Sequence, residues 1–161
     1  MTPQERKSKI RSYGKAYPEL KKALRKFPKR MWKFKPAPDR WSIHEIIIHI
    51  TDSEANSFVR CRRFIAEPGK TVLGYDEHEW SKVMAYHNQS TDIALDLFKH
   101  LRKSSYELIR KLPDSVWSNT VEHTERGTMN FDQWLETYEK HPYAHINQME
   151  KVYEAWKHRA K

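Results

Sequence analysis

The sequence predicts an all-α protein of a single domain, folded as a four-helix bundle. Four long stretches in which apolar residues recur at helical spacing follow one another along the 161 residues. The chain has only four glycines, and charged residues make up 32% of it, a balance that favours helices. This length is sufficient to bury a substantial core. We therefore expect residues 1–161 to form one domain, with sites built between facing helices.

The first two helices have clear start signals. The first should run from Pro3, a residue tolerated in a first helical turn, to about Lys26. Residues 27–40 carry three prolines and indicate a connection. Ser42 should cap the second helix while Glu45 returns the bond in a capping box. This helix should end at residues 67–69, and its buried stripe should consist of Ile43, Ile46, Ile47, Ile50, Phe58, Val59 and Ile65.

The second half of the chain predicts a long connection and two more helices. Residues 68–89 are irregular, and we expect one or two helical turns within 76–84. A polar loop that holds Gly127 should separate the third helix from the fourth. The fourth helix should begin at Asn130, where Gln133 offers a second capping pair, and run to about His158. The third should start near residue 90 and end at 112–113, with a buried stripe of Ile93, Leu97, Leu101, Leu108 and Ile109.

Composition and charge narrow the class of protein. We expect no signal peptide, and no apolar stretch reaches the roughly 18 residues that a membrane span needs. Cys61 is the only cysteine, so disulfides within the chain are excluded and a cytoplasmic location is expected. Residues 1–40 hold 14 Lys or Arg against three acids, whereas the rest of the chain has 16 against 18. This basic segment could attract nucleic acid or an anionic surface, but no nucleic-acid motif accompanies it and we favour a solvated helix face.

Three histidines carry the strongest chemical signal. His141 and His145 are four residues apart, so their Cβ atoms should lie roughly 5–6 Å from each other on one helical face. His49 lies at the edge of the stripe of the second helix and could complete a set of three nitrogen donors if the second and fourth helices face each other. Neutral imidazoles bind Zn, Ni, Cu and Fe well, and three protein ligands leave positions open for water or a thiolate. The face that carries the pair should point into the bundle, because it also holds Trp134, Tyr138, Met149, Val152 and Trp156.

The spacing alone leaves this interpretation open. Nine histidines make accidental pairs unsurprising, and two core histidines bonded to carbonyls or tyrosines explain the pattern equally well. Pro142 removes a backbone bond to residue 138, so we expect a kink or a bulge there. Gln148 could orient a bound water or a substrate, or bond a neighbouring helix. Asp52 could accept from His49 or from a histidine of the fourth helix, although an ordinary ion pair with Arg or Lys is the better interpretation.

The cysteine and the other histidines receive structural interpretations. Cys61 should be a small core residue rather than a nucleophile, because no basic partner at fixed spacing explains its activation. His44, in the first turn of the second helix, should be exposed, and His87 should have a packing role. The remaining histidines should lie on the surface: His78, His100, His123 and His158.

Several motifs, taken in order, resemble one family. Residues 41–54 (WSIHEIIIHITDSE) resemble the second-helix signature of the DinB-like, YfiT-like metal-dependent hydrolases, and residues 141–149 (HPYAHINQM) resemble the signature of the final helix. The resemblance covers about Trp41 to Met149. The motifs between them that are similar to the same family are Gly74-Tyr75-Asp76, Tyr86-His87, Leu112-Pro113-Asp114 with Trp117, and Glu125-Arg126-Gly127-Thr128.

The resemblance implies a four-helix bundle with one divalent metal ion held by His49, His141 and His145. The chain departs from the family at Pro142, where a helix-compatible residue, often Asp, is usual. This departure puts the orientation of His141 in question. The family includes transferases that use low-molecular-weight thiols such as bacillithiol, and a thiol-dependent isomerase, so the resemblance implies a small-molecule substrate.

The leading hypothesis is a metal-dependent enzyme with Zn or Ni, either a hydrolase that uses a metal-bound hydroxide or a transferase that activates a low-molecular-weight thiol. A non-catalytic module that binds a metal or a small ligand is the first alternative. A binder of nucleic acid or of an anionic surface through residues 1–40 is the second. Base rates leave a homodimer open, and no feature of the chain fixes an interface.

Overall fold

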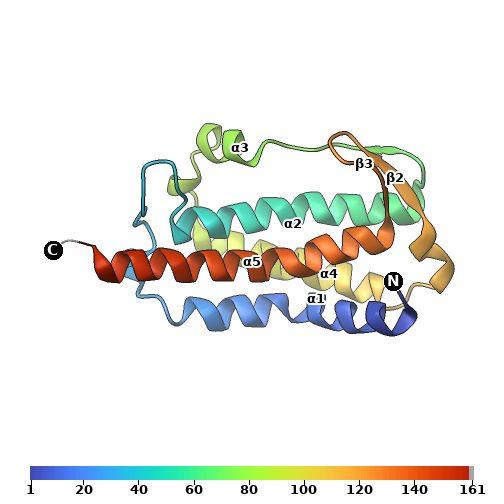
Figure 1. The fold of residues 1–161 in the computed structure, drawn as a ribbon, viewed down its shortest axis with the longest axis horizontal. Coiled ribbons are helices and arrows are strands. Elements are labelled where there is room, and N and C mark those ends of the chain that lie inside the picture. The colour runs from blue at the N-terminus through green and yellow to red at the C-terminus, as the bar shows by residue number, and fades with distance from the viewer. Residues whose placement is uncertain (160–161) are drawn as a thin grey trace.

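Four long helices form a bundle in the computed structural model, which describes residues 1–159 (Figure 1). The helices are α1 (Pro3–Leu24), α2 (Ile43–Ala66), α4 (Thr91–Ile109) and α5 (Phe131–His158). Helix α1 packs on α4 and α5, and α2 packs on the same two helices. Thus α1 and α2 lie diagonally across the bundle although they are consecutive in the chain, which requires long connections over its ends. The predicted bundle is confirmed, and α2 and α5 are neighbours.

Capping side chains explain where the two helices that carry the histidines begin. The Glu45 carboxylate accepts from the Ser42 N–H at 2.9 Å, while Ser42 Oγ accepts from the Glu45 N–H. Asn130 and Gln133 form the same reciprocal pair at the start of α5. Each box satisfies N–H groups that have no partner within the first helical turn. Both boxes were predicted from the sequence and both are confirmed.

The core consists of two apolar clusters, one toward each end of the bundle. On α2, the five isoleucines of residues 43–50 belong to the first cluster, and the second begins at Cys61. On α5, the second cluster ends at Tyr138 and the first begins at Ile146. Between these clusters the long helices carry polar side chains: Glu54, Arg102 and His141. The middle of the bundle is therefore a polar layer enclosed by apolar packing.

A small sheet and a short helix cover one side of the bundle. Strand β1 (Thr71–Val72) pairs in parallel with β2 (Thr120–His123), which pairs antiparallel with β3 (Gly127–Asn130). The predicted polar loop around Gly127 is therefore wrong: it is a hairpin, whose turn uses the φ of +68° that glycine adopts easily. The helical turns expected within 76–84 are confirmed as α3 (Glu77–Val83), which begins at the cap Asp76. Short 3₁₀ turns occupy Lys29–Met31, Tyr86–Asn88 and Asp114–Ser118.

The predicted buried stripes are partly wrong. Ile93 is 72% exposed and Leu97 is 47% exposed on α4, and Val59 is 52% exposed on α2. On α4 the inward face includes a charged residue, Arg102, which is buried because it pairs with Glu54. A search for apolar residues at helical spacing therefore cannot find this face. The inward face of α4 consists of Ala94, Leu95, Phe98, Arg102, Ser105 and Ile109.

Among residues 1–159, no helix has the length and apolar character required to cross a membrane.

Candidate metal centre

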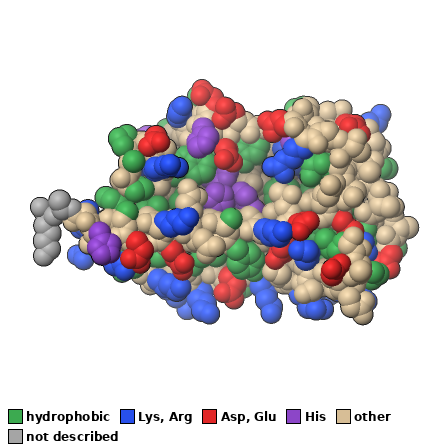
Figure 2. Space-filling model, viewed as in Figure 1, with side chains coloured by type: hydrophobic (Ala, Val, Ile, Leu, Met, Phe, Trp, Pro, Cys, Tyr) green, Lys and Arg blue, Asp and Glu red, His purple; other side chains and the backbone are tan. Residues whose placement is uncertain are grey.

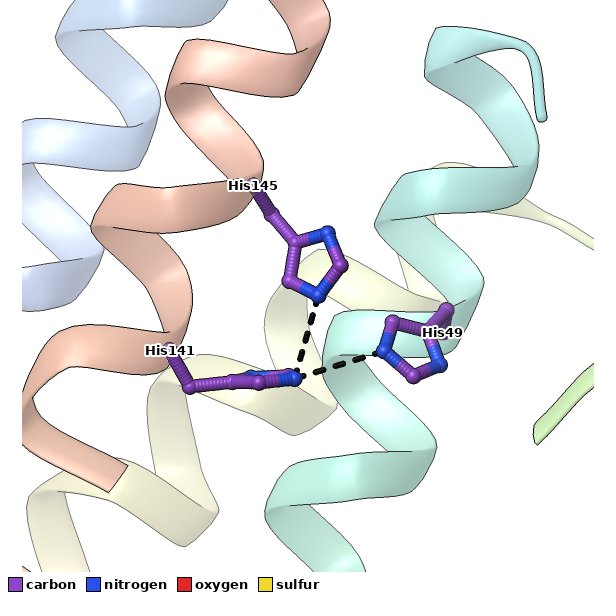
Figure 3. A group of neighbouring side chains, drawn as sticks. All are labelled: His49, His141 and His145. Atoms are coloured by element: carbon purple, nitrogen blue, oxygen red, sulfur yellow. Dashed lines mark hydrogen bonds between the residues drawn. The ribbon is translucent and has the colours of Figure 1, made fainter. Parts of the chain in front are cut away.

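Helices α2 and α5 bring three histidines together in the middle of the bundle (Figure 3). His49 Nε2 lies 3.3 Å from His141 Nε2, and His145 Nε2 lies 3.1 Å from the same atom. One ring nitrogen from each of the three residues lies within 4.8 Å of the other two. His49 is fully buried rather than at the edge of its stripe. The three rings therefore direct nitrogens to one point between the two helices.

Neighbouring side chains fix two of these rings. The Trp41 ring packs on His49 with 4.5 Å between ring centroids, and Trp41 Nε1 donates to Ser81 Oγ of α3 at 3.2 Å. Gln148 Oε1 lies 2.7 Å from His145 Nδ1. Because an amide oxygen only accepts, Nδ1 of His145 carries the hydrogen and its Nε2 offers a lone pair to the shared point.

Burial keeps all three imidazoles neutral. It lowers the pKa of His49 to about 3, with a smaller contribution from the neighbouring His145. It also lowers the pKa of His141 to about 2, again with a contribution from His145. The pKa of His145 is lowered by burial too, although its bond to Gln148 opposes this. At neutral pH the rings are therefore in the form that binds metal ions.

The donor set fits a divalent metal ion better than it fits a purely structural role. Each neutral imidazole has one N–H, so three rings that meet through Nε2 atoms cannot all satisfy one another. His49 Nδ1 is buried and has no hydrogen-bond partner among the described residues, so no protein group there fixes which nitrogen of this ring offers a lone pair. A cation accepts the three lone pairs at once, and ligands at 2.0–2.1 Å from a tetrahedral ion are about 3.3 Å apart. The separations of His141 Nε2 from the other two Nε2 atoms, 3.1 and 3.3 Å, are close to this value, and all three candidate ligand atoms lie within 4.8 Å of one another.

Comparison with known proteins identifies the family. The profile of the DinB superfamily matches residues 13–149, which is most of the chain. The chain belongs to the DinB superfamily. The resemblance seen in the sequence motifs is thereby confirmed.

Relatives in sequence support the same assignment, and solved structures share the fold. A protein of Oceanobacillus iheyensis named "Putative metal-dependent hydrolase" is 31% identical over 112 residues, which cover 68% of this chain and 64% of that protein. A protein of the same name from Halalkalibacterium halodurans is 27% identical over 111 residues, and here too the match spans only 64% of the relative. YfiT of Bacillus subtilis, a four-helix bundle of unusual topology, has the same fold with a TM-score of 0.88 at 19% identity, covering 98% of this chain and 90% of YfiT. A mycothiol-dependent maleylpyruvate isomerase shares the fold with a TM-score of 0.70 at 13% identity, covering 92% of this chain and 61% of that one.

The interpretations given to Asp52 are both wrong in this DinB protein. Its Oδ2 accepts from the Tyr86 hydroxyl at 2.6 Å, and no described Arg or Lys pairs with it. Tyr86 follows α3, and its buried phenol requires an acceptor. The Asp52 carboxylate therefore bonds the connection between α2 and α4, and it does not accept a hydrogen bond from His49 Nδ1.

Sequence reasoning missed Glu77, the first residue of α3. Its Oε2 lies 3.6 Å from His49 Nε2, and its side chain is 48% exposed. The residue stands in an irregular connection, where no periodic pattern marks a side chain as inward. The one signal was its position directly after the motif at residues 74–76. The DinB centre therefore has a solvent-accessible carboxylate beside its three nitrogens.

Pro142 is accommodated by a residue from another helix. Proline lacks the N–H that would bond the Tyr138 carbonyl one turn earlier. Arg102 Nη1 of α4 donates to this carbonyl at 2.9 Å, and Arg102 Nη2 lies 2.5 Å from Glu54 Oε2. Tyr13 donates its hydroxyl hydrogen to Glu54 Oε1 at 2.7 Å. Helix α5 stays α-helical through Pro142, and the turn that carries His141 is tied to α4.

A cavity of about 310 Å³ adjoins the histidines of the DinB centre. Its lining includes His141 and Glu77 as well as side chains of the small sheet. Figure 2 shows histidine side chains in a recess at the centre of one face of the molecule, with acidic and basic side chains around it. The centre is therefore open to a small molecule on this side.

Two histidines that were predicted to be exposed are buried. His44 is 8% exposed, and its backbone N–H donates to the Trp32 carbonyl in the connection before α2 at 2.8 Å. His123 is 6% exposed and lies on β2, in the lining of the cavity. The surface prediction failed because the sheet that covers His123 was not recognised. Cys61 is buried as predicted.

Proposed function

We propose that this protein is an enzyme that uses one divalent metal ion, Zn or Ni, held by His49, His141 and His145. The observation that carries the proposal is the convergence of three neutral imidazole nitrogens beside a cavity that a small molecule can enter. When bound, such an ion supplies positive charge that lowers the pKa of a water molecule or a thiol. Three protein ligands are also the number typical of catalytic rather than structural sites.

Three side chains around the centre are assigned separate roles in this proposal. Glu77 is positioned to accept the proton that the water or thiol loses, because its Oε2 lies 3.6 Å from His49 Nε2. Its exposed side can then release that proton to solvent. Gln148 holds His145 in the tautomer whose Nε2 is free to bind the ion. Trp41 covers His49 and keeps water from that face of the ring.

Hydrolysis is the first candidate reaction, supported by the name of the Oceanobacillus iheyensis relative. Transfer or isomerisation that depends on a low-molecular-weight thiol is the second, supported by the mycothiol-dependent isomerase of the same fold. In both reactions a nucleophile loses a proton beside the centre, so both require the same three histidines and the same acceptor. A panel of esters, amides and thiol substrates separates the two.

The first experiment is elemental analysis of tag-free protein. We expect about one Zn or Ni per chain in the wild type, loss of the metal in folded His49→Ala, His141→Ala and His145→Ala, and retention in the control His100→Ala. His100 is exposed on α4 and does not belong to the cluster. Absence of metal after reconstitution with Zn and with Ni would contradict the proposal.

The second experiment separates binding from catalysis. Glu77→Gln keeps the size of the side chain but cannot accept a proton at neutral pH. We expect this variant to retain the metal and to lose turnover by roughly 10²–10⁴-fold. Loss of the metal instead would identify Glu77 as a ligand. Bound metal without turnover of any substrate in the wild type would indicate a binding module.

A further inference from the structure

The cavity beside the metal centre contains positive charge that the metal site does not explain. Arg60 of α2 and Arg126 of the β2–β3 turn both contribute to its lining. No carboxylate oxygen of residues 1–159 lies within 4.0 Å of either guanidinium group. By contrast, the buried guanidinium of Arg102 has Glu54 as its partner. Two cations that form no ion pair with the described residues therefore line this cavity.

Arg60 is held in place by neutral groups only. Its Nη1 donates to the Tyr138 hydroxyl at 2.6 Å, and its Nη2 donates to the Leu73 carbonyl. These bonds fix the guanidinium plane, but a hydroxyl and a carbonyl do not cancel its charge. A partly buried cation without an anion is costly, and this cost is recovered when an anionic ligand binds. The Arg60 guanidinium is therefore already oriented before an anionic ligand binds.

His123 adds a neutral donor to the same wall. Its Nδ1 accepts from the Glu125 N–H at 3.2 Å, so its hydrogen is on Nε2. Burial lowers the pKa of His123, and the charges of Arg60 and Arg126 lower it further, whereas the charge of Glu125 opposes this. The hairpin turn, closed by the Arg126 N–H bond to the His123 carbonyl at 3.2 Å, keeps these two residues together.

Two acidic residues also line the cavity, and neither pairs with Arg60 or Arg126. Glu77 is near His49, on the side of the metal centre. Glu125 packs against Gly74, where any side chain would collide with its carboxylate. One end of the cavity thus lies at the histidines and Glu77, where we place the reaction. The other end holds the hydrogen-bond donors Arg60, Arg126 and His123.

We propose that Arg60, Arg126 and His123 bind an anionic oxygen group of the substrate, a carboxylate or a phosphate. Arginine is suited to this role because its planar fork matches both groups. The substrate class is then a small anionic molecule, held at this group while its reacting bond or thiol lies at the histidines. The volume of about 310 Å³ is at the lower end of the range for small-molecule sites. This inference rests on the proposed function for the identity of the site as a substrate site, but the binding of anions can be measured without turnover.

The test is calorimetric titration of the full chain with three probes, in metal-loaded form and after removal of metal with a chelator. Succinate carries carboxylates, inorganic phosphate tests the other source of the same chemistry, and succinamide is an uncharged match for succinate. We expect succinate or phosphate, but not succinamide, to bind in both forms. The stronger of the two anions identifies the group that the substrate carries.

Matched variants locate the binding. We expect Arg60→Gln and Arg126→Gln each to weaken binding of the anion at least tenfold. The control Arg11→Gln, an exposed arginine that also lacks a carboxylate partner and does not line the cavity, should change it less than twofold. Arg126 is exposed, so its variant is expected to fold even if the Arg60 variant does not.

The outcomes separate the two proposals. Binding that depends on the arginines in metal-free protein supports the anionic subsite even if the metal assay fails. Binding only in metal-loaded protein, unchanged by both arginine variants, would place the anion on the metal and overturn the subsite while leaving the proposed function intact. Absence of anion binding in both forms would also overturn it.

Discussion

The buried pair of Arg102 and Glu54 provides the sharpest test of how this fold supports its centre. The two side chains are 2% and 1% exposed, and the same guanidinium serves the Tyr138 carbonyl that Pro142 leaves free. The change Arg102→Met keeps much of the side-chain length but removes every donor. It leaves a buried carboxylate and a backbone carbonyl of α5 without their partner.

The size of the effect follows from these losses. Removal of one partner of a buried ion pair costs about 3–5 kcal/mol, because the remaining charge stays buried. For a domain of this size, 1 kcal/mol corresponds to about 2–4 °C, so the midpoint of thermal unfolding should fall by about 6–20 °C. Glu54→Met should cost a similar amount, since it leaves Arg102 charged and alone.

The double variant distinguishes charge from packing. Burial raises the pKa of Glu54 although Arg102 acts to lower it, so the pair does not fully offset its loss of hydration. Arg102→Met combined with Glu54→Met removes both charges, and we expect it to be at least about 2 kcal/mol more stable than additivity predicts. Pro142→Ala in the Arg102→Met background should recover about 1 kcal/mol, because alanine restores the N–H that bonds the Tyr138 carbonyl.

The assay is urea denaturation together with thermal unfolding, both in the presence of a chelator so that bound metal does not add to the stability. An exposed control is available in Arg110→Met, since Arg110 pairs with Glu107 at the surface and such pairs contribute little. Single variants that each cost less than about 1 kcal/mol, or a double variant that is simply additive, would refute the reasoning.

Two further predictions concern packing and reactivity. Burial raises the pKa of Cys61 to about 12, so at pH 8 we expect no measurable alkylation of the native protein by iodoacetamide and rapid alkylation in urea; reaction of the folded protein would contradict this. Gly14→Ala would place a Cβ atom 2.7 Å from the Tyr106 ring on α4, so it should cost about 1–3 kcal/mol, although alanine usually favours a helix. Adding Tyr106→Leu to Gly14→Ala should remove most of that penalty, as measured by urea denaturation. A Gly14→Ala protein that is more stable than the wild type would show that α1 and α4 are less closely packed.

Local signals predicted the helices and most of the candidate ligands. Ser42 with Glu45 and Asn130 with Gln133 start their helices through bonds between residues three apart, so the information is contained in the sequence. The spacing of His141 and His145 likewise placed both on one face. Spacing could not show whether they meet His49, because that depends on α2 and α5 being neighbours in the bundle.

The errors share a different cause, which is pairing between distant residues. Arg102 is inside because Glu54 is its partner across the bundle, and Asp52 is engaged because Tyr86 arrives from the long connection. The hairpin that carries His123 was missed because its strands are only four residues long and polar. In each case the partner decides the burial of the residue, and no property of the residue alone reveals it.

The candidate residues stand on two kinds of element, the long helices and the shorter segments that cover them. The three histidines stand on α2 and α5, whose long helices are fixed by capping boxes and by packing, so the distances between their nitrogens are set by rigid parts. Glu77, His123 and Arg126 belong to the short helix α3 and to a hairpin, elements that tolerate change in length and sequence more easily. Substitutions on these covering elements would alter the proposed proton acceptor and the charge of the cavity without moving the histidines. The candidate ligands can therefore stay fixed while His123 and Arg126 of the proposed anion group change, whereas Arg60 shares α2 with His49.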